Sequence, residues 1–384
     1  MKKSLWVVLF SSFALLACSD SDAPTKADDP HPDEPEVVAI DYSAGRAMNK
    51  RLGKGINFGN SWDSNSRGLN GDCGWRNCIK DEYFKLIADA GFNSIRLPVR
   101  WHFDSDYETH TVNPDKLKGV EEDIQLAIDN GLAVVVNFHH YTTLNDLGGG
   151  AYRGNPDSVA LFQAEKDHFL ALWDQLSKEL NKFPDSLLVL EILNEPSIPS
   201  ADIVNDITLS AFNVIRKNAP NKTVMMEAYH LGKFAELQTL RLPQDGNIIF
   251  SGHYYEPYTY SHQGHSPQYA CIGDDAFGST MGGDMKGYVA LAKKLYPDVN
   301  GGHVPMNMGE FGVSGQTGPC KAKGPSDKKK ALWAQKAIAA AELYDISWHY
   351  WGFVGVGGFE AYDKANEQWY PGFPEAFFPE TTAE

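Results

Sequence analysis

Several features are scarce in this sequence of 384 residues, and each scarcity excludes a class of protein. Basic residues are outnumbered, with 34 Lys and Arg against 50 Asp and Glu and a net charge of −16, so the clustered positive charge of a nucleic-acid binder is missing. No G-x-S-x-G, phosphate-loop or H-E-x-x-H pattern occurs, which excludes the commonest esterases, nucleotide-binding enzymes and zinc proteases. Aromatic residues, by contrast, are abundant, with 9 Trp, 17 Tyr and 20 Phe.

The apolar run near the N-terminus has the organisation of a secretory signal. Two lysines precede residues 5–17, and this stretch is too short to span a bilayer core comfortably. Leu15-Leu16-Ala17-Cys18 resembles a bacterial lipobox, in which the chain is cleaved before the cysteine and the new N-terminus is acylated. We expect residues 1–17 to be a lipoprotein signal peptide and Cys18 to be lipidated, which would make the protein a secreted lipoprotein anchored to the bacterial cell surface or outer membrane.

Residues 18–36 continue as an acidic, proline-rich segment. Residues 19–36 hold seven Asp or Glu, one Lys and four Pro, a composition that cannot bury enough apolar area to offset chain entropy. We predict an extended tether between the lipidated cysteine and a single folded domain over residues 37–384.

Cysteine is also scarce, with five in the chain. Lipidation of Cys18 would leave four, Cys73, Cys78, Cys271 and Cys320, and export to an oxidising compartment favours disulfides. Neither C-x-x-C nor the usual histidine spacing of a zinc site occurs. Of the three possible connectivities we favour Cys73 with Cys78 and Cys271 with Cys320. The second pair would tie two long loops together.

Short apolar runs alternate with helical patterns from about residue 50 onward. Runs this apolar are typical of strands covered on both faces, as in a parallel sheet. The runs are residues 55–58, 94–97, 133–138, 187–193, 223–226, 247–250, 304–308 and 346–351. Between them apolar residues recur at three- and four-residue steps, as helices require. Eight such repeats predict an α/β fold, a (β/α)₈ TIM barrel of one domain.

The last repeat is the weak point of this prediction. After the eighth run only residues 373–378 could supply a helix, so we expect partial closure there. A doubly wound open sheet is the alternative, but no G-x-G-x-x-G follows the first strand.

Two glutamates stand at the predicted strand ends, where a barrel gathers its chemistry. Glu195 follows the fourth strand and Glu310 follows the seventh, and burying carboxylates for stability alone would be costly. Two carboxylates across a barrel mouth are what glycosidic bond cleavage requires, because one protonates the leaving oxygen and the other attacks or supports the anomeric carbon.

The motifs at the strand ends, taken in order, resemble glycoside hydrolase family 5 and its cellulase branch. They are Ser94-Ile95-Arg96-Leu97-Pro98, His139-His140, Leu193-Asn194-Glu195-Pro196, His253-Tyr254-Tyr255 and Met308-Gly309-Glu310-Phe311-Gly312, and the resemblance covers about residues 45–375. It implies a retaining, endo-acting hydrolase of cellulose or mixed-linkage β-1,4-glucan, with Glu195 as acid/base and Glu310 as nucleophile. It implies no metal and no organic cofactor.

The resemblance also implies supporting roles for other residues. Arg96 would hold Glu310 ionised from beneath, and Tyr255 would donate a hydrogen bond to it. Asn194 would bind the 2-hydroxyl of the reacting sugar. The remaining residues would be orienting donors or, for the tryptophan, a floor on which the sugar stacks: His139, His253 and Trp351. With the carboxyls roughly 5.5 Å apart, a charged Glu310 would raise the pKa of Glu195 and keep it protonated.

Further residues near the strand ends have both a functional and a structural interpretation. We expect Glu191 to be a hydrogen-bonded interior carboxylate and His140 to be structural. Two rim carboxylates matter only if Glu310 does not serve: Glu227 and Glu256. Five aromatic residues either form a sugar-stacking cleft or pack under loops: Trp62, Trp101, Tyr141, Tyr258 and Tyr260. A metal is a weak alternative at His262 and His265, near Asp274 and Asp275.

Two classes of function stay open at this point. The first is an endoglucanase displayed on the cell surface, and the second is a non-catalytic glycan-binding lipoprotein that kept the barrel and lost the chemistry. The presence of both glutamates, the arginine and the H-x-Y motif favours the enzyme. Xyloglucan and mannan remain alternative substrates. We expect a monomer whose partners are a β-glucan polysaccharide and, through Cys18, a membrane.

Overall fold

The computed structural model describes residues 37–64, 75, 77–265, 269–274, 277–278, 281–315, 320–321 and 323–379. The signal peptide, the lipidation of Cys18 and the tether that we predict for residues 1–36 lie outside the described residues. Within the described ranges, no helix is both long and apolar enough to cross a membrane.

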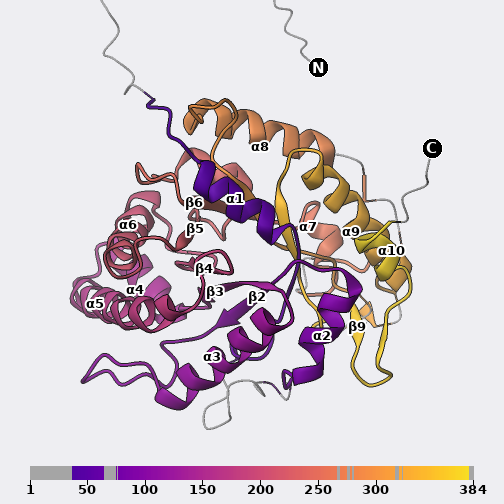
Figure 1. Ribbon diagram of the computed structural model, residues 1–384, viewed down its shortest axis with the longest axis horizontal. Helices are drawn as coiled ribbons and strands as arrows, with labels where there is room; N and C mark the ends of the chain where they lie inside the picture. Colours follow the sequence, from indigo (N-terminus) through magenta and orange to yellow (C-terminus); the bar gives the residue numbers. More distant parts are fainter. Residues whose placement is uncertain are drawn as a thin grey trace, which may run out of the picture. The chain divides into compact units, whose positions relative to one another are not determined.

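Eight parallel strands close into a barrel in chain order, which confirms the (β/α)₈ prediction (Figure 1). The strands are β1 (Lys54–Asn57), β2 (Ser94–Val99), β3 (Ala133–Phe138), β4 (Leu188–Glu191), β5 (Thr223–Glu227), β6 (Ile248–Tyr254), β7 (Met306–Phe311) and β8 (Ser347–Tyr350). β1 pairs with β2 on one side and with β8 on the other. The expected partial closure is therefore wrong, because the sheet closes without help from a long final helix.

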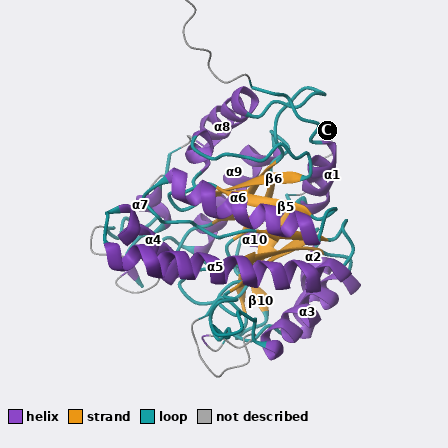
Figure 2. Ribbon diagram, turned by 90° about the vertical axis from the view of Figure 1, so that its left-hand side faces the viewer, coloured by secondary structure: helices purple, strands orange, loops and turns teal. Residues whose placement is uncertain are grey.

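Helices surround the barrel, and Figure 2 shows the strands enclosed between them. They are α1 (Ser43–Leu52), α2 (Asp81–Ala90), α3 (Pro114–Asp129), α4 (Thr142–Tyr152), α5 (Pro156–Glu179), α6 (Ala201–Asn218), α7 (Tyr258–Ser261), α8 (Met281–Leu295), α9 (Asp327–Glu342) and α10 (Phe373–Phe377). The connection from β5 to β6 departs from the expected pattern, since it carries only the 3₁₀ segment η3 (Phe234–Gln238). Two short antiparallel strands follow β8: β9 (Tyr362–Asp363) and β10 (Gln368–Trp369).

Local sequence signals set the limits of these helices. Asn113 caps α3 by accepting hydrogen bonds from the backbone N–H groups of Asp115 and Lys116, and Asn155 caps α5 by accepting one from the backbone N–H of Asp157. Both caps are followed by a proline at the first helical position, where a missing N–H costs nothing. Gly91 ends α2 at φ +104°, in the left-handed region that favours glycine.

Two apolar clusters form the core. The larger one lies between the strands and the surrounding helices. The smaller one fills the barrel interior near the N-terminal ends of the strands. There Met48 and Leu52 of α1 pack against Ala133, Val135 and Val189. Ala133 is the first residue of β3, so α1 covers the end of the barrel at which the strands begin. The opposite end, where the strands finish, is left for the polar residues.

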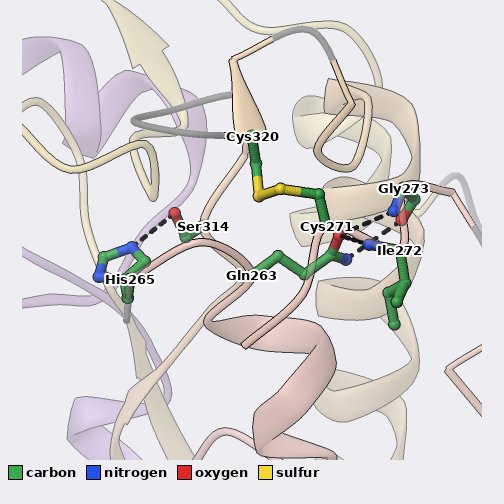
Figure 3. Close-up of a disulfide and its surroundings, with 7 residues drawn as sticks. All are labelled: Gln263, His265, Cys271, Ile272, Gly273, Ser314 and Cys320. Atoms are coloured by element: carbon green, nitrogen blue, oxygen red, sulfur yellow. Dashed lines mark hydrogen bonds between the residues drawn. A yellow bond between two sulfur atoms is a disulfide. The ribbon is translucent and has the colours of Figure 1, made fainter. Parts of the chain in front are cut away.

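The predicted pair Cys271 and Cys320 forms a disulfide in the structure, with the two Cα atoms 5.4 Å apart (Figure 3). It joins the segment after α7 to the segment after β7. Gln263 is buried beside it and accepts hydrogen bonds from the backbone N–H groups of Ile272 and Gly273, each at 2.8 Å. Cys78 is also disulfide-bonded, whereas its predicted partner Cys73 lies outside the described residues.

Candidate active site

Arg96 is the centre of the polar network inside the barrel. It lies in the middle of β2, not at the end of a strand as expected, and its side chain is fully buried. Its Nε donates to Glu191 at 2.7 Å, its Nη1 to Glu310 at 2.7 Å and its Nη2 to Asn194 at 2.6 Å. Nη1 also donates to Asn57 at 2.9 Å. A guanidinium suits this position because its donors are fixed in one plane and its charge is permanent.

Glu310 receives donors on both carboxylate oxygens. Arg96 donates to Oε1 at 2.7 Å and the hydroxyl of Tyr255 donates to Oε2 at 3.0 Å. The β6–β7 register shifts between Gly252 and His253, and this shift pairs His253 with Glu310. The carboxylate is only 7% exposed, so its orientation is set by protein groups and not by water.

Glu195 follows β4 and is held differently. Its backbone has φ +47°, which a non-glycine residue adopts at a cost and which recurs at functional sites. Nδ1 of His253 lies 2.9 Å from its Oε1, and the side chain is 27% exposed. One carboxylate oxygen of Glu195, one of Glu310 and one ring nitrogen of His253 all lie within 4.8 Å of one another. The structure therefore brings the two predicted glutamates together.

The remaining predicted residues surround this pair. Asn194 accepts from Arg96 through Oδ1, while its buried Nδ2 has no hydrogen-bond partner among the described residues and can donate to a ligand. Asn137 accepts the backbone N–H of Val99 through Oδ1 and presents its Nδ2 to Nδ1 of His139. Nδ1 of His139 must then be the acceptor, so the proton sits on Nε2.

Trp351 immediately follows β8 and is partly exposed. Its ring stacks on that of His139, with centroids 5.8 Å apart and an interplanar angle of 7°. A side chain on Gly59 would lie 2.4 Å from the Trp351 ring, so glycine is needed there for close approach. The ring also lines a shallow surface depression together with Asn60 and Glu360.

The pKa shifts of Glu195 and Glu310 differ from the expectation. Burial works to raise the pKa of Glu195, but the hydrogen bond and charge of His253 outweigh it and lower that pKa. Burial holds the pKa of Glu310 above its ordinary value, although the charges of His253 and Arg96 oppose it. The expected rise at Glu195 is therefore wrong for the resting site, because His253 is closer to Glu195 than the sequence could indicate.

Four of the five aromatic residues that we considered for a sugar-stacking cleft are buried: Trp62, Trp101, Tyr141 and Tyr260. The indole N–H of Trp62 donates to Asp123 at 2.6 Å, and that of Trp101 to the carbonyl of Asn137 at 2.9 Å. These rings are packed inside the protein and cannot touch a substrate in this structure. Tyr258 is partly exposed and stacks on His262 with centroids 3.9 Å apart.

The suggested metal site on the loop after β6 is not assembled in the described residues. His265 is bonded through Nε2 to the hydroxyl of Ser314 at 2.7 Å, and Asp274 accepts from the backbone and hydroxyl of Ser326. Asp275 lies outside the described residues. His140 has φ +48° and burial lowers its pKa to about 4, so it stays neutral beside the catalytic pair.

Three further polar residues belong to the site, although they were missed or set aside from the sequence. Asn57, the last residue of β1, donates to the carbonyls of Gly309 and His349 and accepts from Arg96. Asp63 is fully buried, and burial raises its pKa to about 6. Glu227, which we set aside, contacts the backbone of Glu195 at 2.8 Å. For Asn57 and Glu227 the available signal was a polar residue at a strand end, whereas Asp63 lies in the segment after β1 and had no such signal.

A closed barrel that presents two neighbouring carboxylates at the end where its strands finish defines a (β/α)₈ glycoside hydrolase. Comparison with protein families narrows this class. The model of the cellulase family, glycosyl hydrolase family 5, matches residues 53–354, so this chain belongs to that family.

Individual relatives are distant. The chain is 26% identical to Endoglucanase H of Acetivibrio thermocellus over 219 residues, which are 56% of this chain but 22% of that relative. It is 24% identical to Endoglucanase 1 of Ruminococcus albus over 353 residues, which cover 85% of this chain and 78% of the relative. This chain thus spans less than a quarter of the first relative and most of the second.

Solved structures agree with the fold. A structure described as an endoglucanase has a TM-score of 0.73 at 26% identity and covers 88% of this chain and 100% of its own. Thermotoga maritima Cel5A in complex with mannotriose has a TM-score of 0.71 at 27% identity and covers 87% of this chain and 99% of its own.

Proposed function

We propose that this protein is a retaining endo-β-1,4-glucanase that cleaves cellulose or mixed-linkage glucan by double displacement. The observation that carries the proposal is the approach of the Glu195 and Glu310 carboxylate oxygens to within 4.8 Å. Retaining glycosidases keep their carboxyl groups about 5–5.5 Å apart, whereas inverting ones separate them by about 6.5–9.5 Å to admit a water molecule. The approach of the two oxygens supports the retaining alternative.

In the first step, the Glu310 carboxylate attacks the anomeric carbon while the bond to the leaving oxygen breaks. Glu195 gives its proton to that oxygen, and the sugar becomes an ester of Glu310. Glu310 fits the nucleophile because Arg96 and Tyr255 fix both of its oxygens. Glu195 fits the acid because it is the more exposed of the two.

In the second step, the Glu195 carboxylate takes a proton from water, and the water oxygen attacks the anomeric carbon. The ester bond to Glu310 breaks and the carboxylate is restored. The free Nδ2 of Asn194 would donate to the sugar 2-hydroxyl, a contact that strengthens as the oxocarbenium-like transition state develops.

Glu310→Gln tests the nucleophile, because an amide cannot form the ester. We expect turnover of barley glucan to fall by about 10⁴-fold or more, while binding to the polysaccharide persists in affinity electrophoresis. Glu165→Gln is the matched control, since Glu165 is also buried and hydrogen-bonded but lies outside the site, on α5. Undiminished hydrolysis by the Glu310 variant would refute the mechanism, and a first product of inverted configuration in proton NMR would refute retention.

Mannan and xyloglucan are the second choice of substrate. The similarity to Thermotoga maritima Cel5A supports this alternative, because that protein was solved with mannotriose as well as with cellobiose. Initial rates on carboxymethylcellulose, barley glucan, xyloglucan, mannan and xylan would rank the substrates. A rate on mannan or xyloglucan above that on both glucans would overturn the assignment to glucan.

We further propose that the enzyme is displayed on a bacterial membrane through a lipid on Cys18. The lysines and the apolar run before Leu15-Leu16-Ala17-Cys18 support this proposal. Expression of the full chain in a bacterium with labelled palmitate should label the protein, and Cys18→Ala should abolish the label. A variant that is labelled like the wild type would contradict lipidation at this cysteine.

A further inference from the structure

Asn137 lies in β3, two residues before His139, and takes no part in the mechanism above. Its side chain is fully buried. The side-chain Oδ1 accepts the backbone N–H of Val99 at 3.2 Å, and the main-chain carbonyl accepts the indole N–H of Trp101 at 2.9 Å. Asn137 is therefore held through its backbone and through its side chain, and the amide has one fixed orientation.

This orientation decides where His139 carries its proton. A backbone N–H can only donate, so the atom of Asn137 that faces Val99 must be the oxygen. The amide nitrogen Nδ2 then faces His139, 3.1 Å from Nδ1 of the ring. Burial holds the pKa of His139 well below its ordinary value, so the ring is neutral. Because Nδ2 can only donate, Nδ1 accepts and the single ring proton is on Nε2.

The surroundings of Nε2 suit a hydrogen and not a lone pair. Oδ2 of Asp63 lies 4.0 Å from Nε2, too far for a hydrogen bond, and this buried oxygen has no hydrogen-bond partner among the described residues. A bare Nε2 would place a lone pair beside this oxygen. The ring itself is fixed, because it stacks on Trp351 with an interplanar angle of 7° and the backbone N–H of His139 donates to the carbonyl of Val99 at 2.8 Å.

We propose that Asn137 is a positioning residue that keeps His139 as a hydrogen-bond donor, so that Nε2–H can bind a hydroxyl group of the sugar beside Trp351. This inference rests on the function proposed above. The imidazole is neutral throughout and its proton is not transferred. A sugar hydroxyl that accepts from Nε2 keeps its own hydrogen for another acceptor, whereas a hydroxyl facing a bare Nε2 would have to give that hydrogen to the ring.

Asn137→Asp tests the proposal because it reverses the direction of one hydrogen bond. The carboxylate keeps an oxygen for the backbone N–H of Val99, but its second oxygen can only accept. Nδ1 of His139 must then carry the proton, and the neutral ring loses the proton from Nε2. We expect kcat/KM on cellotetraose at neutral pH to fall by about tenfold, as for the loss of one hydrogen bond to the substrate. A value equal to that of the wild type would overturn the proposal.

Asn205→Asp is the matched control. Asn205 lies on α6 and is also buried. Its Oδ1 accepts a backbone N–H at 2.8 Å and its Nδ2 donates to a backbone carbonyl at 2.8 Å, so this variant buries a carboxylate at a comparable cost but faces no imidazole through these contacts. At a temperature where both variants are folded, kcat/KM of Asn205→Asp should stay within about twofold of the wild type.

The pH profile separates this role from a merely structural one. A carboxylate beside Nδ1 raises the pKa of His139, and below the raised pKa the ring is protonated on both nitrogens, so Nε2–H is present again. The ratio of kcat/KM of Asn137→Asp to that of the wild type should therefore approach one at acid pH and fall as pH rises. A ratio that is low and constant at every pH would overturn the proposal. The other charged and titratable groups near His139 occur in both proteins: Asp63, Arg96, Arg100, His140 and His253.

The wild-type protein gives a test that survives a failure of Asn137→Asp to fold. Long-range ¹H–¹⁵N spectra of ¹⁵N-labelled protein distinguish protonated from bare ring nitrogens, and the signals that disappear in His139→Asn assign the ring. We expect a bare Nδ1 and a protonated Nε2 at neutral pH, and a proton on Nδ1 would overturn the proposal. Failure of the proposed function is distinct, because the wild type would then not hydrolyse cellotetraose while its spectrum would still show the proton on Nε2.

Discussion

Replacing Arg96 by Lys keeps the positive charge inside the barrel but removes the planar arrangement of donors. Arg96 makes five hydrogen bonds, two of them to Glu191 and one each to Asn57, Asn194 and Glu310. An ammonium has three donors around a single atom, so it cannot reach partners that lie on three sides of a guanidinium. At least two of these bonds must be lost.

The expected loss of stability follows from burial. A hydrogen bond to a charged group contributes about 1.5–3 kcal/mol, and breaking a buried ion pair costs about 3–5 kcal/mol. The side chains of Arg96 and Glu191 are both fully buried, so water cannot replace the lost donors. We expect Arg96→Lys to reduce the free energy of unfolding by about 3–5 kcal/mol. At about 2 °C per kcal/mol for a large domain, Tm falls by about 6–10 °C.

Activity should fall further than stability suggests, because Glu310 loses the donor that aims it. Misplacement of a reacting group by about 1 Å costs about 10²-fold, so kcat/KM on barley glucan should fall by about that factor at a temperature where the variant is folded. Arg241→Lys is the control. Arg241 and Asp202 form an exposed ion pair, and such pairs contribute little to the free energy of unfolding. If the Tm and the kcat/KM of Arg96→Lys equal those of Arg241→Lys within error, Arg96 does not hold the site together as described.

Two further predictions concern the hydroxyl of Tyr255 and the disulfide. Tyr255→Phe removes the hydroxyl that donates to Glu310 at 3.0 Å and should lower kcat/KM on soluble glucan by about 10- to 100-fold. Tyr107→Phe, which removes a hydroxyl bonded to Glu165, is the control. Equal rates for the two variants would contradict the role of Tyr255 in orienting Glu310. The disulfide between Cys271 and Cys320 closes a loop with a sequence separation of 49. Replacing both cysteines by Ser should lower the free energy of unfolding by up to about 4 kcal/mol, which calorimetry would detect as a lower Tm. A Tm equal to that of the wild type would show that the segment is already held by Gln263 and its partners.

The fold was predictable because each strand is an apolar run with turn signals on both sides. Parallel strands buried on both faces leave this pattern in the sequence whatever their neighbours are. The connection from β5 to β6 was harder, since η3 is too short to show helical periodicity. The last helix is also short, yet the barrel closes, because closure depends on backbone pairing between β1 and β8.

The site was only partly predictable, and the failures have one cause. Trp62 and Trp101 follow strands, as substrate-binding aromatics do, but their indole N–H groups are turned inward to Asp123 and to the carbonyl of Asn137. Such orientations depend on contacts with α3 and β3, which follow these tryptophans much later in the sequence. Asn57 was missed for the same reason, since its contact with Arg96 follows from the register of β1 and β2.

The two glutamates have different catalytic roles because the residues around them differ. Glu310 faces Arg96, whose charge is permanent at any pH at which the protein folds. Nδ1 of His253 is hydrogen-bonded to Glu195 at 2.9 Å and lies farther from Glu310, at 3.7 Å, and an imidazole can gain and lose a proton near neutral pH. A nucleophile needs a charge that does not change until the bond forms, whereas an acid/base must exchange a proton twice in each cycle. Strand β2 therefore supplies the constant partner and strand β6 the exchangeable one, and the residue types on these two strands decide which carboxylate does which task.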